Sequence, residues 1–332
     1  MTASAFVLAA GFGTRLQPLT HVRPKPLVPL CGVPALAYSL ALCAEHGLTD
    51  VIVNAHYLAD QVEAWAGEHE GVRVRVSTES PDILGTGGGL RIVRDQLNER
   101  FAVLNADVLH DVDLTALLAA VPPGGGAMAL RPHREDAARY GIVAADATGR
   151  VTTLSNVAEG PAEGAVRTDT HFTGIHALDR SALEHVPEGF ACIVRSAYVA
   201  LVPQRAVGSL RHPGVWLDAG DPAAYLEANL DLLHRRVTLS LDPHARAAVA
   251  RDPSGEGHGE LPEVHLDGPV WVGHDACVGQ GARLASTVVG HGATVAAGAE
   301  LVDCVVWDGV TVPRGSYRGT IFYADDGQIT PG

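Results

Sequence analysis

Short apolar runs separated by amphipathic segments mark the N-terminal part of the chain. Residues 6–10 and 51–53 are continuous apolar runs and residues 72–76 alternate valine with arginine, so each predicts a β-strand. Residues 35–46 and 58–66 carry apolar side chains at helical spacing and predict helices. This alternation of strands and helices predicts a mostly parallel sheet covered by helices, in which ligands bind at the carboxyl ends of the strands.

A different pattern fills the C-terminal part, where single apolar residues recur at steps of six, six and five. The composite period of seventeen residues predicts a parallel β-helix, in which each coil buries its inner face only by stacking on the next. The same period places His274, His291 and Asp308 in one column, which we interpret as solvated or facing an interface, with a metal site as the alternative. The recurring apolar residues are Val272, Val278, Leu284, Val289, Val295, Leu301, Val306 and Val312.

The segment after the first predicted strand has the composition of an anion-binding loop. Gly11 and Gly13 allow a tight turn and a close approach of a ligand, and successive N–H groups in such a turn bind anions. Arg15 adds a planar cation suited to phosphate oxygens. Prolines on both sides of Lys25 prevent a regular helix and stiffen its backbone. The pattern is neither a dinucleotide fingerprint nor a Walker A loop, and a plain tight turn is the alternative.

The loop after residue 76 carries four glycines within 85–89 and leads into a helical segment that reaches about residue 97. Bare backbone at a helix start allows close approach to the base or ribose of a nucleotide, and a flexible loop is the alternative. Glu79 lies just ahead of the glycines. Its two oxygens would suit the donor groups of a guanine base, although exposed glutamates are usually only solvated.

Two further stretches carry aspartates at defined positions. The strand at 101–104 runs into Asn105 and Asp107, where Asp107 by itself would cap the next helix. Much later, the run Gly-Val-Trp-Leu-Asp-Ala-Gly-Asp-Pro at 214–222 contains Asp218 and Asp221. Asp221 precedes a proline and is predicted to cap a helix over 222–233.

Composition and charge narrow the functional classes. The 332 residues suffice for two domains, and the formal net charge of −14 argues against a nucleic-acid partner. The five cysteines are odd in number and form no C-x-x-C pair, which predicts free thiols in a reducing compartment. The N-terminus lacks the basic region of a signal peptide, and no apolar stretch is long enough to span a bilayer. We therefore expect a cytoplasmic protein with no membrane partner.

The combined pattern of the first loop is more specific than its parts. The run from Gly11 to Thr20, GFGTRLQPLT, together with Pro-Lys-Pro-Leu at 24–27, resembles the signature of the sugar-phosphate nucleotidyltransferases, or NDP-sugar pyrophosphorylases. The resemblance implies an α/β nucleotidyltransferase domain with a Rossmann-like mixed sheet over residues 1–235. It further implies that the β-helix is of the left-handed hexapeptide type, over residues 265–320. Residues 236–264 are polar and rich in glycine and predict a linker, and residues 321–332 are left as a tail.

The resemblance also assigns roles to residues. Arg15, Lys25 and Asp107 are implied to be catalytic, and Asp107 with Asp218 are the implied ligands of Mg²⁺, the expected cofactor. The implied nucleotide-binding residues are Leu8, Ala10, Gly11, Gly13, Thr14, Glu79, Gly85, Thr86 and Gly87. Those implied for the sugar are Gly141, Asn156, Thr173, Gly174 and Trp216.

One departure from the family pattern concerns the sugar phosphate. Many members carry Glu-Lys-Pro in the segment that closes over the sugar, and that lysine holds the sugar phosphate. Residues 155–161 of this chain contain no lysine. Family types that act on muramate or heptose phosphates lack it too, so activity is still expected. The candidate substitutes are Arg131, His133, Arg167 and His171.

The reaction implied is nucleotidyl transfer from a nucleoside triphosphate to a sugar 1-phosphate, which gives an NDP-sugar and pyrophosphate. No serine or cysteine nucleophile with a matching base is evident, and His176 fits a packed histidine in an alternating strand. Residues 305–309 and the glycine-rich loop resemble mannose-1-phosphate guanylyltransferases, which favours guanylyl transfer to mannose 1-phosphate or a similar hexose or heptose 1-phosphate. Residues 86–89 without Glu-Lys-Pro resemble muramate-phosphate uridylyltransferases, so uridylyl or thymidylyl transfer to a muramate- or glucose-type sugar is the alternative.

Other classes of protein remain as rivals. A regulatory subunit that binds nucleotide sugars without turnover would explain the missing lysine. An acyltransferase would explain a β-helix, but few coils and no evident catalytic histidine in a long coil loop argue against it. For the β-helix alone we expect a structural or oligomer-forming role, so the protein is expected to form homo-oligomers.

Overall fold

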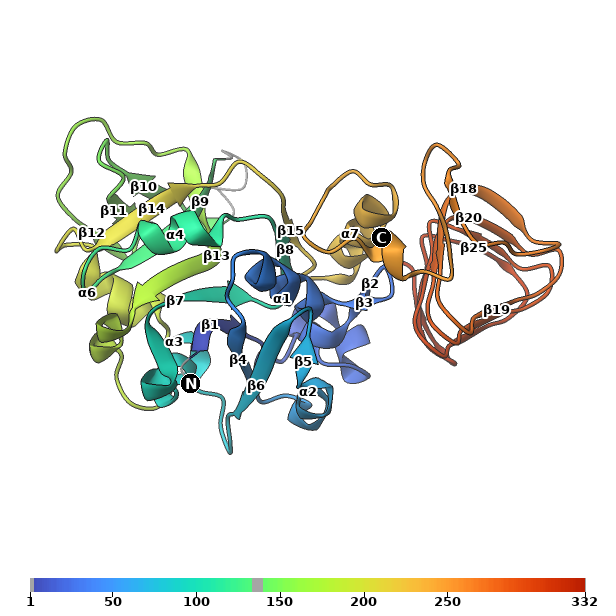
Figure 1. Ribbon diagram of the computed structural model, residues 1–332, viewed down its shortest axis with the longest axis horizontal. Coiled ribbons are helices and arrows are strands. Elements are labelled where there is room, and N and C mark those ends of the chain that lie inside the picture. Colours follow the sequence, from blue (N-terminus) through green and yellow to red (C-terminus); the bar gives the residue numbers. More distant parts are fainter. Residues whose placement is uncertain (1–2, 133–139, 332) are drawn as a thin grey trace. The chain divides into compact units, whose positions relative to one another are not determined.

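The computed structural model describes residues 3–132 and 140–331 (Figure 1). The chain folds into two compact units. The first comprises Met1–Phe12, Ser39–Ala106 and His110–Trp216. The second comprises Gly13–Tyr38, Asp107–Leu109 and Leu217–Gly332, so the units do not follow the predicted boundary at residue 235.

The first unit is built on an eight-stranded sheet with the order β14-β9-β13-β7-β1-β4-β6-β5. Strands β7, β1, β4 and β6 are parallel, whereas β13 runs antiparallel to both β7 and β9. The expected mixed sheet is therefore confirmed. The strands are β1 (Ala3–Leu8), β4 (Asp50–Ala55), β5 (Glu68–His69), β6 (Val72–Thr78), β7 (Leu97–Asn105), β9 (Gly126–Pro132), β13 (Thr170–Asp179) and β14 (Val207–Arg211).

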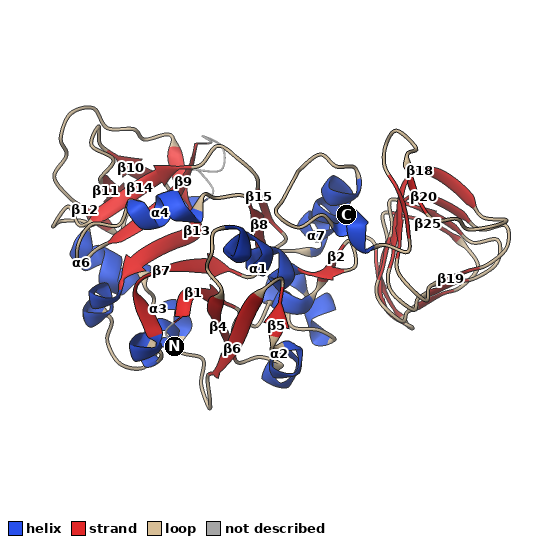
Figure 2. Ribbon diagram, in the orientation of Figure 1, coloured by secondary structure: helices blue, strands red, loops and turns tan. Residues whose placement is uncertain are grey.

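The central strands are apolar without alternation because both of their faces are covered. Phe6 in β1 pairs with Ile52 on one side and Val103 on the other, and all three side chains are buried. Figure 2 shows short helices beside the sheet. The helices are α1 (Ala35–Glu45), α2 (Ala59–Trp65), α3 (Gly85–Ile92), α4 (Leu114–Ala119) and α6 (Val199–Leu201). The helix predicted to reach residue 97 ends at Ile92, and β7 begins at Leu97.

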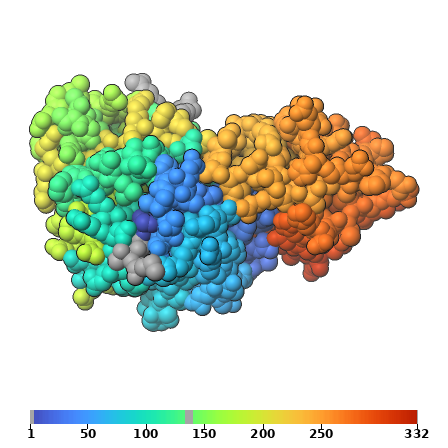
Figure 3. Space-filling model, viewed as in Figure 1, coloured from blue at the N-terminus to red at the C-terminus, as the bar shows by residue number. Residues whose placement is uncertain are grey.

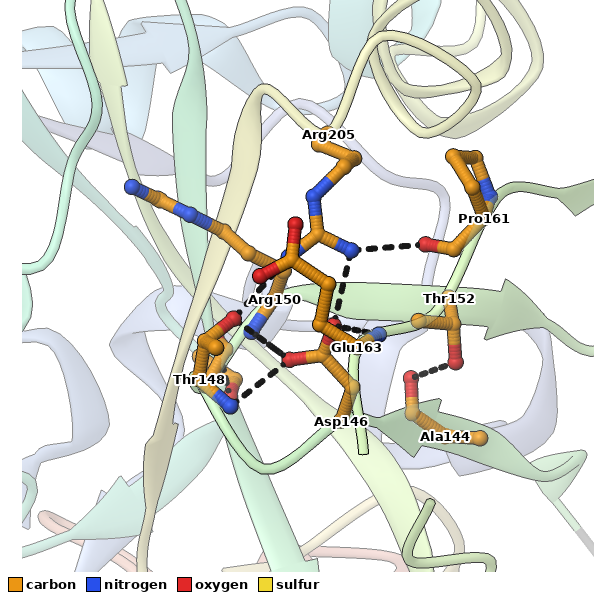
Figure 4. Close-up of polar contacts among 10 residues, drawn as sticks. Ala144, Asp146, Thr148, Arg150, Thr152, Pro161, Glu163 and Arg205 are labelled. Carbon is orange, nitrogen blue, oxygen red and sulfur yellow. Dashed lines mark hydrogen bonds and ion pairs between the residues drawn. The ribbon is translucent and has the colours of Figure 1, made fainter. Parts of the chain in front are cut away.

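A small sheet of β10 (Val143–Ala145), β11 (Val151–Leu154) and β12 (Ala158–Glu159) is organised by Asp146. The Asp146 carboxylate has no exposed surface. It accepts hydrogen bonds of 2.7–3.1 Å from the N–H and Oγ1 of Thr148, the N–H groups of Arg150 and Glu163, and the Arg205 guanidinium (Figure 4). Burial alone would raise the pKa of Asp146, but these bonds hold the pKa well below its usual range.

Replacing Asp146 with asparagine is expected to lower the free energy of unfolding by about 3 kcal/mol at pH 7, because Arg205 loses its buried charged partner and keeps only the exposed Glu163. A carboxyl group whose pKa is lower in the folded than in the unfolded protein stabilises the folded protein at every pH above the pKa of the unfolded state. The contribution of Asp146 is therefore lost as the pH falls below about 4. Urea unfolding of both proteins from pH 7 towards pH 3 measures the difference, which should shrink in acid.

Glu163→Gln is the matched control for this experiment. The Glu163 carboxylate pairs with the same Arg205 at 3.4 Å but is 66% exposed. Its removal should change the free energy of unfolding by less than about 0.5 kcal/mol. A difference for Asp146→Asn that does not vary with pH would contradict the role of its charge.

The C-terminal part of the second unit is a parallel β-helix with the predicted period. Residues 272, 289 and 306 stack in one column, residues 278, 295 and 312 in a second, and residues 284 and 301 in a third. The coils form one continuous orange-to-red surface in Figure 3. The left-handed sense of the coils stays a prediction. The strands are β18 (His265–Val272), β19 (Cys277–Val278), β20 (Arg283–Val289), β21 (Thr294–Val295), β22 (Glu300–Val302), β23 (Val305–Val306), β24 (Thr311–Val312) and β25 (Ser316–Arg318).

The stretch predicted as a linker, 236–264, is more ordered than expected. It contains β16 (Val249–Arg251) and β17 (Gly257–His258), and β16 pairs antiparallel with β18 of the β-helix. The predicted tail likewise forms a hairpin of β26 (Ile321–Ala324) and β27 (Gly327–Ile329). The apolar signal of these strands is short, because β16 and β26 bury two residues each and β17 and β27 bury none.

Helix α7 (Pro222–Leu233) has the predicted bounds. Asp221 caps it, since its side chain accepts a hydrogen bond from the N–H of Ala224 at 2.9 Å, and the predicted capping role is confirmed. The second unit also contains the hairpin of β2 (Pro29–Leu30) and β3 (Val33–Pro34), which lies beside α7 (Figure 1). Strand β15 (Trp216–Asp218) pairs with β8 (Val108–His110).

All five cysteines carry free thiols, as predicted. Within residues 3–132 and 140–331, no helix has the length and apolar character needed to cross a membrane.

Candidate active site

The signature loop (residues 13–29) contains no α-helix because of its prolines. It forms three short 3₁₀ turns instead, Thr14–Leu16, Leu19–His21 and Lys25–Leu27. Gly13 has a φ of 62°, in the left-handed region that favours glycine, and a side chain there would meet Thr20 at 2.7 Å. The Thr20 hydroxyl donates to the Gly13 carbonyl at 2.9 Å. The loop, which carries Arg15, Arg23 and Lys25, is therefore held in one shape.

Lys25 is the only lysine among the 24 lysines and arginines of the chain. Its ammonium pairs with the carboxylate of Asp107, which follows β7 directly. The Lys25 side chain is 12% exposed and that of Asp107 is 27% exposed, so the pair is largely shielded from water. An ammonium is a compact charge with three donors, whereas a guanidinium is a planar fork. A chain that uses arginine everywhere else keeps an ammonium at this position.

A second pair joins Arg15 to Asp218, with Nη1 3.8 Å from Oδ2. Strand β15 ends at Asp218 and presents the carboxylate, which is 15% exposed. A side chain at Gly220 would lie 2.8 Å from Asp218 Oδ1 and 2.9 Å from Arg15, so glycine leaves room for both groups. Each predicted metal carboxylate thus has one predicted catalytic cation beside it.

The donor set fits a magnesium ion. In the part of the chain that the structure describes, no group of three or more histidine, cysteine, aspartate or glutamate side chains could hold a metal by itself. Mg²⁺ in phosphate-transfer sites usually takes only one or two carboxylates and completes its coordination with water and substrate phosphates. Asp107 and Asp218 are carboxylates of that kind.

The glycine-rich segment of the first unit is explained by packing within the protein. A side chain at Gly88 would lie 2.2 Å from the carbonyl oxygen of Gly189, and one at Gly85 would lie 2.7 Å from that of Ala191. The N–H of Gly87 donates to Ala191 at 2.8 Å, and the Thr86 hydroxyl accepts from Ile193 at 3.0 Å. These glycines let the start of α3 pack on residues 189–193, a reason that the sequence did not indicate.

Glu79 is buried rather than exposed to a ligand. Its Oε1 accepts a hydrogen bond from Asn54 at 2.7 Å and its Oε2 accepts from the N–H of Leu84 at 2.6 Å. Asn54 in turn accepts from the N–H of Ala9 at 2.6 Å. The carboxylate therefore joins the residues after β1 to the start of α3, and it does not face a ligand.

The remaining nucleotide-binding predictions lie at the end of β1 and in the loop after it. Leu8 pairs with Asn105 of β7, and its carbonyl accepts from the N–H of Ala106 at 3.1 Å. Ala10 is buried, whereas a side chain at Gly11 would meet nothing within 4 Å. Gly11 therefore offers open backbone, as the prediction requires.

Trp216 is the centre of a cluster in the first unit that contains two predicted sugar-binding residues, Trp216 itself and Thr173. Its ring lies 5.3 Å from the rings of both Tyr140 and His171, and the Arg131 guanidinium carbon lies 5.6 Å from its centroid. The indole N–H donates to the carbonyl of Thr173 at 3.0 Å. The Thr173 hydroxyl itself is buried and donates to the Ala129 carbonyl.

The other sugar-side predictions are spread more widely. Gly174 leaves space for Asn105, since a side chain there would lie 2.3 Å from its Nδ2, and Gly141 does the same for Ser155. Asn156 is exposed in the turn between β11 and β12. Of the substitutes for the missing lysine, the structure brings together Arg131 and His171, and His133 lies outside the described residues.

Arg167 lies elsewhere in the first unit. It lines a cavity of about 190 Å³ with Arg211 and Asp146. Arg131 and His171 pair across β9 and β13, whereas the cavity is lined by their neighbours Leu130 and Thr170. Because successive strand residues point to opposite faces, Arg167 is separated from the Trp216 cluster by the sheet.

His176 is a packed histidine, as predicted. Its side chain is buried, and its Nδ1 lies 2.8 Å from the hydroxyl of Tyr198. Burial lowers the pKa of His176 to about 3, so the ring is neutral at physiological pH. A neutral, enclosed imidazole supports the fold rather than the reaction.

Fold and site together define a sugar-phosphate nucleotidyltransferase. Residues 4–235 match the model of the nucleotidyl transferase family, and the chain belongs to that family. The mannose-1-phosphate guanylyltransferase of Mycobacterium tuberculosis is 32% identical over 295 residues, which cover 86% of this chain and 79% of that protein. The UTP–glucose-1-phosphate uridylyltransferase of Synechocystis is 26% identical over 302 residues, which cover 84% of this chain and 76% of that protein.

A solved structure supports the fold. The crystal structure of HddC from Yersinia pseudotuberculosis matches with a TM-score of 0.55 and 20% identity, over 69% of this chain and 98% of that chain. At this identity the likeness concerns the fold alone. The predicted family, fold class and enzyme class are confirmed by the family match and the curated relatives.

Proposed function

We propose that this enzyme transfers a guanylyl group from GTP to mannose 1-phosphate or a similar hexose or heptose 1-phosphate. The observation that carries the proposal is the pairing of Lys25 with Asp107 and of Arg15 with Asp218 in one compact unit. The base and sugar are favoured by the guanylyltransferase name of the relative with 32% identity. Uridylyl transfer to a glucose- or muramate-type sugar is the second candidate, which the Synechocystis relative supports.

In the proposed reaction, a phosphate oxygen of the sugar 1-phosphate attacks the α-phosphorus of the triphosphate. A P–O bond forms there as the bond from the α-phosphorus to the bridging oxygen breaks, and pyrophosphate leaves with those electrons. Arg15 and Lys25 bind the phosphate oxygens and stabilise the charge that moves to the leaving group. The backbone of Gly11, Gly13 and Thr14 orients the triphosphate, and this positioning can supply about 7–11 kcal/mol at best.

The two ion pairs, Lys25 with Asp107 and Arg15 with Asp218, suit this chemistry. Each cation sits against a carboxylate, which holds it close to the place where it is used, and the shielded Lys25 is not left unpaired. We infer that the phosphates take over Lys25 and Arg15 when substrate binds, which leaves Asp107 and Asp218 for the metal. Asp107 and Asp218 would hold Mg²⁺, which would supply positive charge to offset that of the phosphates.

On the sugar side we assign the phosphate contact to Arg131 rather than to Arg167. His171 is fully buried and supports Arg131 from the paired strand. Both lie against Trp216, whose indole is fixed by Thr173 and offers an apolar face to a sugar ring. On the nucleotide side, the start of α3 consists of Gly85, Thr86 and Gly87. Glu79 sets the position of that helix. We also propose a cytoplasmic location and a homo-oligomer.

A panel of four nucleoside triphosphates against mannose, glucose, heptose and muramate-type sugar 1-phosphates tests the proposal through pyrophosphate release. GTP with mannose 1-phosphate, or with a related hexose or heptose, is expected to give the highest kcat/KM. A preference for UTP or dTTP of more than about tenfold would replace guanylyl transfer with the second candidate. No pyrophosphate from any pair would favour the regulatory subunit.

A further inference from the structure

Both ends of the segment that carries Lys25 are linked to the same coil of the β-helix, the N-terminal end directly and the C-terminal end through Tyr225 of α7. On the N-terminal side, Arg23 Nη1 donates to Asp308 Oδ2 at 3.1 Å, and the guanidinium carbon lies 5.1 Å from the centre of the Trp307 ring. An arginine that combines an ion pair with an aromatic face has little rotational freedom. Pro24 separates Arg23 from Lys25 with a φ of −63°, so the two backbones are rigidly coupled.

On the C-terminal side a buried chain of hydrogen bonds reaches the loop from the same coil. Trp307 Nε1 donates to the hydroxyl of Tyr225 at 2.9 Å, and that hydroxyl donates to the carbonyl of Pro29. Trp307 is 1% exposed and Tyr225 is fully buried. Neither donor can turn to water if its partner moves, so displacing the loop would leave a buried polar group unpaired.

The hairpin after the loop is anchored in the same way. The N–H of Cys31 donates to the buried side chain of Asn229 at 2.8 Å. Gly32 packs directly on Trp271 of β18, since a side chain there would come within 2.0 Å of the indole ring. The hairpin that follows the loop is therefore tied to both α7 and the β-helix.

Asp308 is itself oriented by the column predicted from the repeat. Its Oδ1 accepts from the N–H of His291 at 3.0 Å, and His291 Nδ1 accepts from the N–H of His274 at 3.0 Å. Asp325, seventeen residues later, likewise accepts a backbone hydrogen bond, from Thr311 at 3.0 Å. The column is thus a ladder of backbone contacts, and at Asp308 it also reaches Arg23.

We propose that Trp307 and Asp308 are positioning residues for Lys25, through which the β-helix holds the signature loop in the geometry that the transfer reaction needs. The proposal rests on the proposed function, in which Lys25 binds phosphate. It gives the β-helix a part in the reaction of its own subunit, in addition to any part in assembly.

Steady-state kinetics of Asp308→Ala, Arg23→Ala and the double variant provide the first test. Each single change is expected to lower kcat about tenfold by loosening the loop, with KM values within about twofold. The double variant should be no slower than the singles, because both remove the same interaction. Arg23→Lys keeps a cation and should recover most of the kcat. Asp325→Ala, the matched control, should keep the kcat of the unmodified enzyme.

The single lysine allows a second test that needs no substrate. Full-length protein grown with ¹³Cε-labelled lysine gives one side-chain NMR signal, which is that of Lys25. Asp308→Ala should shift or broaden this signal, whereas Asp325→Ala should leave it in place. If Asp308 acted only on the stability of the β-helix, Asp308→Ala would lower the midpoint of thermal unfolding without moving the Lys25 signal.

The proposal is overturned if Asp308→Ala keeps kcat within about twofold of the unmodified enzyme and leaves the lysine signal unmoved. If Asp308→Ala does not fold, Asp308→Asn and Arg23→Gln carry the same two measurements, since asparagine keeps the oxygen that accepts from His291. A fully active Lys25→Ala variant would overturn the proposed function instead. The NMR result is independent of that outcome, so the two failures are distinguishable.

Discussion

Replacing Lys25 with alanine is expected to lower kcat by about a thousandfold while the protein stays folded, because a preorganised charged donor is lost from the site. Other contacts set the shape of the loop that carries Lys25, namely those of Gly13 with Thr20 and of Pro29 with Tyr225. The loop is therefore expected to keep its shape without the Lys25 side chain. Lys25→Arg should also fail, by at least about tenfold, because the guanidinium is larger and planar. Pyrophosphate release measures the rate, and circular dichroism with a thermal scan measures the fold.

Arg251→Ala is the control for a lost cation. Arg251 is exposed on β16 and lies in the same compact unit as Lys25, so its removal should leave the rate within about twofold. A Lys25→Ala enzyme with a near-normal rate would remove Lys25 from the reaction and with it the proposed role of the signature loop.

Replacing Asp107 with asparagine is expected to lower kcat/KM by about a hundredfold to a thousandfold. The change removes a proposed magnesium ligand and leaves the Lys25 ammonium without its anionic partner. The variant should also need a higher Mg²⁺ concentration for half-maximal rate, because an amide oxygen is a weaker ligand than a carboxylate. A magnesium titration at saturating substrate measures this shift.

Asp95→Asn serves as the control, since Asp95 is an exposed aspartate of the first unit. It should leave both the rate and the magnesium requirement unchanged. If Asp107→Asn lost activity without any change in magnesium requirement, Asp107 would act through Lys25 alone, and the metal would have to be assigned to other groups.

Much of the fold could be predicted because its signals are local. The apolar runs at 51–53 and 101–104 form buried strands. Asp221, which precedes a proline, caps helix α7, and that helix has the predicted bounds. The seventeen-residue period was recovered in the strand register. A repeat of identical spacing has few ways to bury its apolar residues, so its pattern nearly specifies its structure.

Residues whose partners lie far along the chain were interpreted less well. Four glycines in a loop suggested open backbone for a ligand, yet three of them make room for residues 189–193. Glu79 was predicted to accept hydrogen bonds from the donor groups of a guanine base, yet its carboxylate is bound by Asn54 and Leu84 within the protein. Asp146, which organises a small sheet with Arg205, gave no signal at all, because its five donors come together only in the folded chain.

The sequence by itself determined the chemistry available to this protein: a loop stiffened by prolines with Arg15 and Lys25, two aspartates after apolar strands, and a periodic C-terminal domain. Only the tertiary structure decided which groups meet. It paired Lys25 with Asp107 and Arg15 with Asp218, and it joined Trp307 and Asp308 to the loop across more than two hundred and seventy residues of chain. The reason is physical, since residue spacing reports the period of a strand or helix, whereas an ion pair or a buried hydrogen bond depends on the packing of the whole unit.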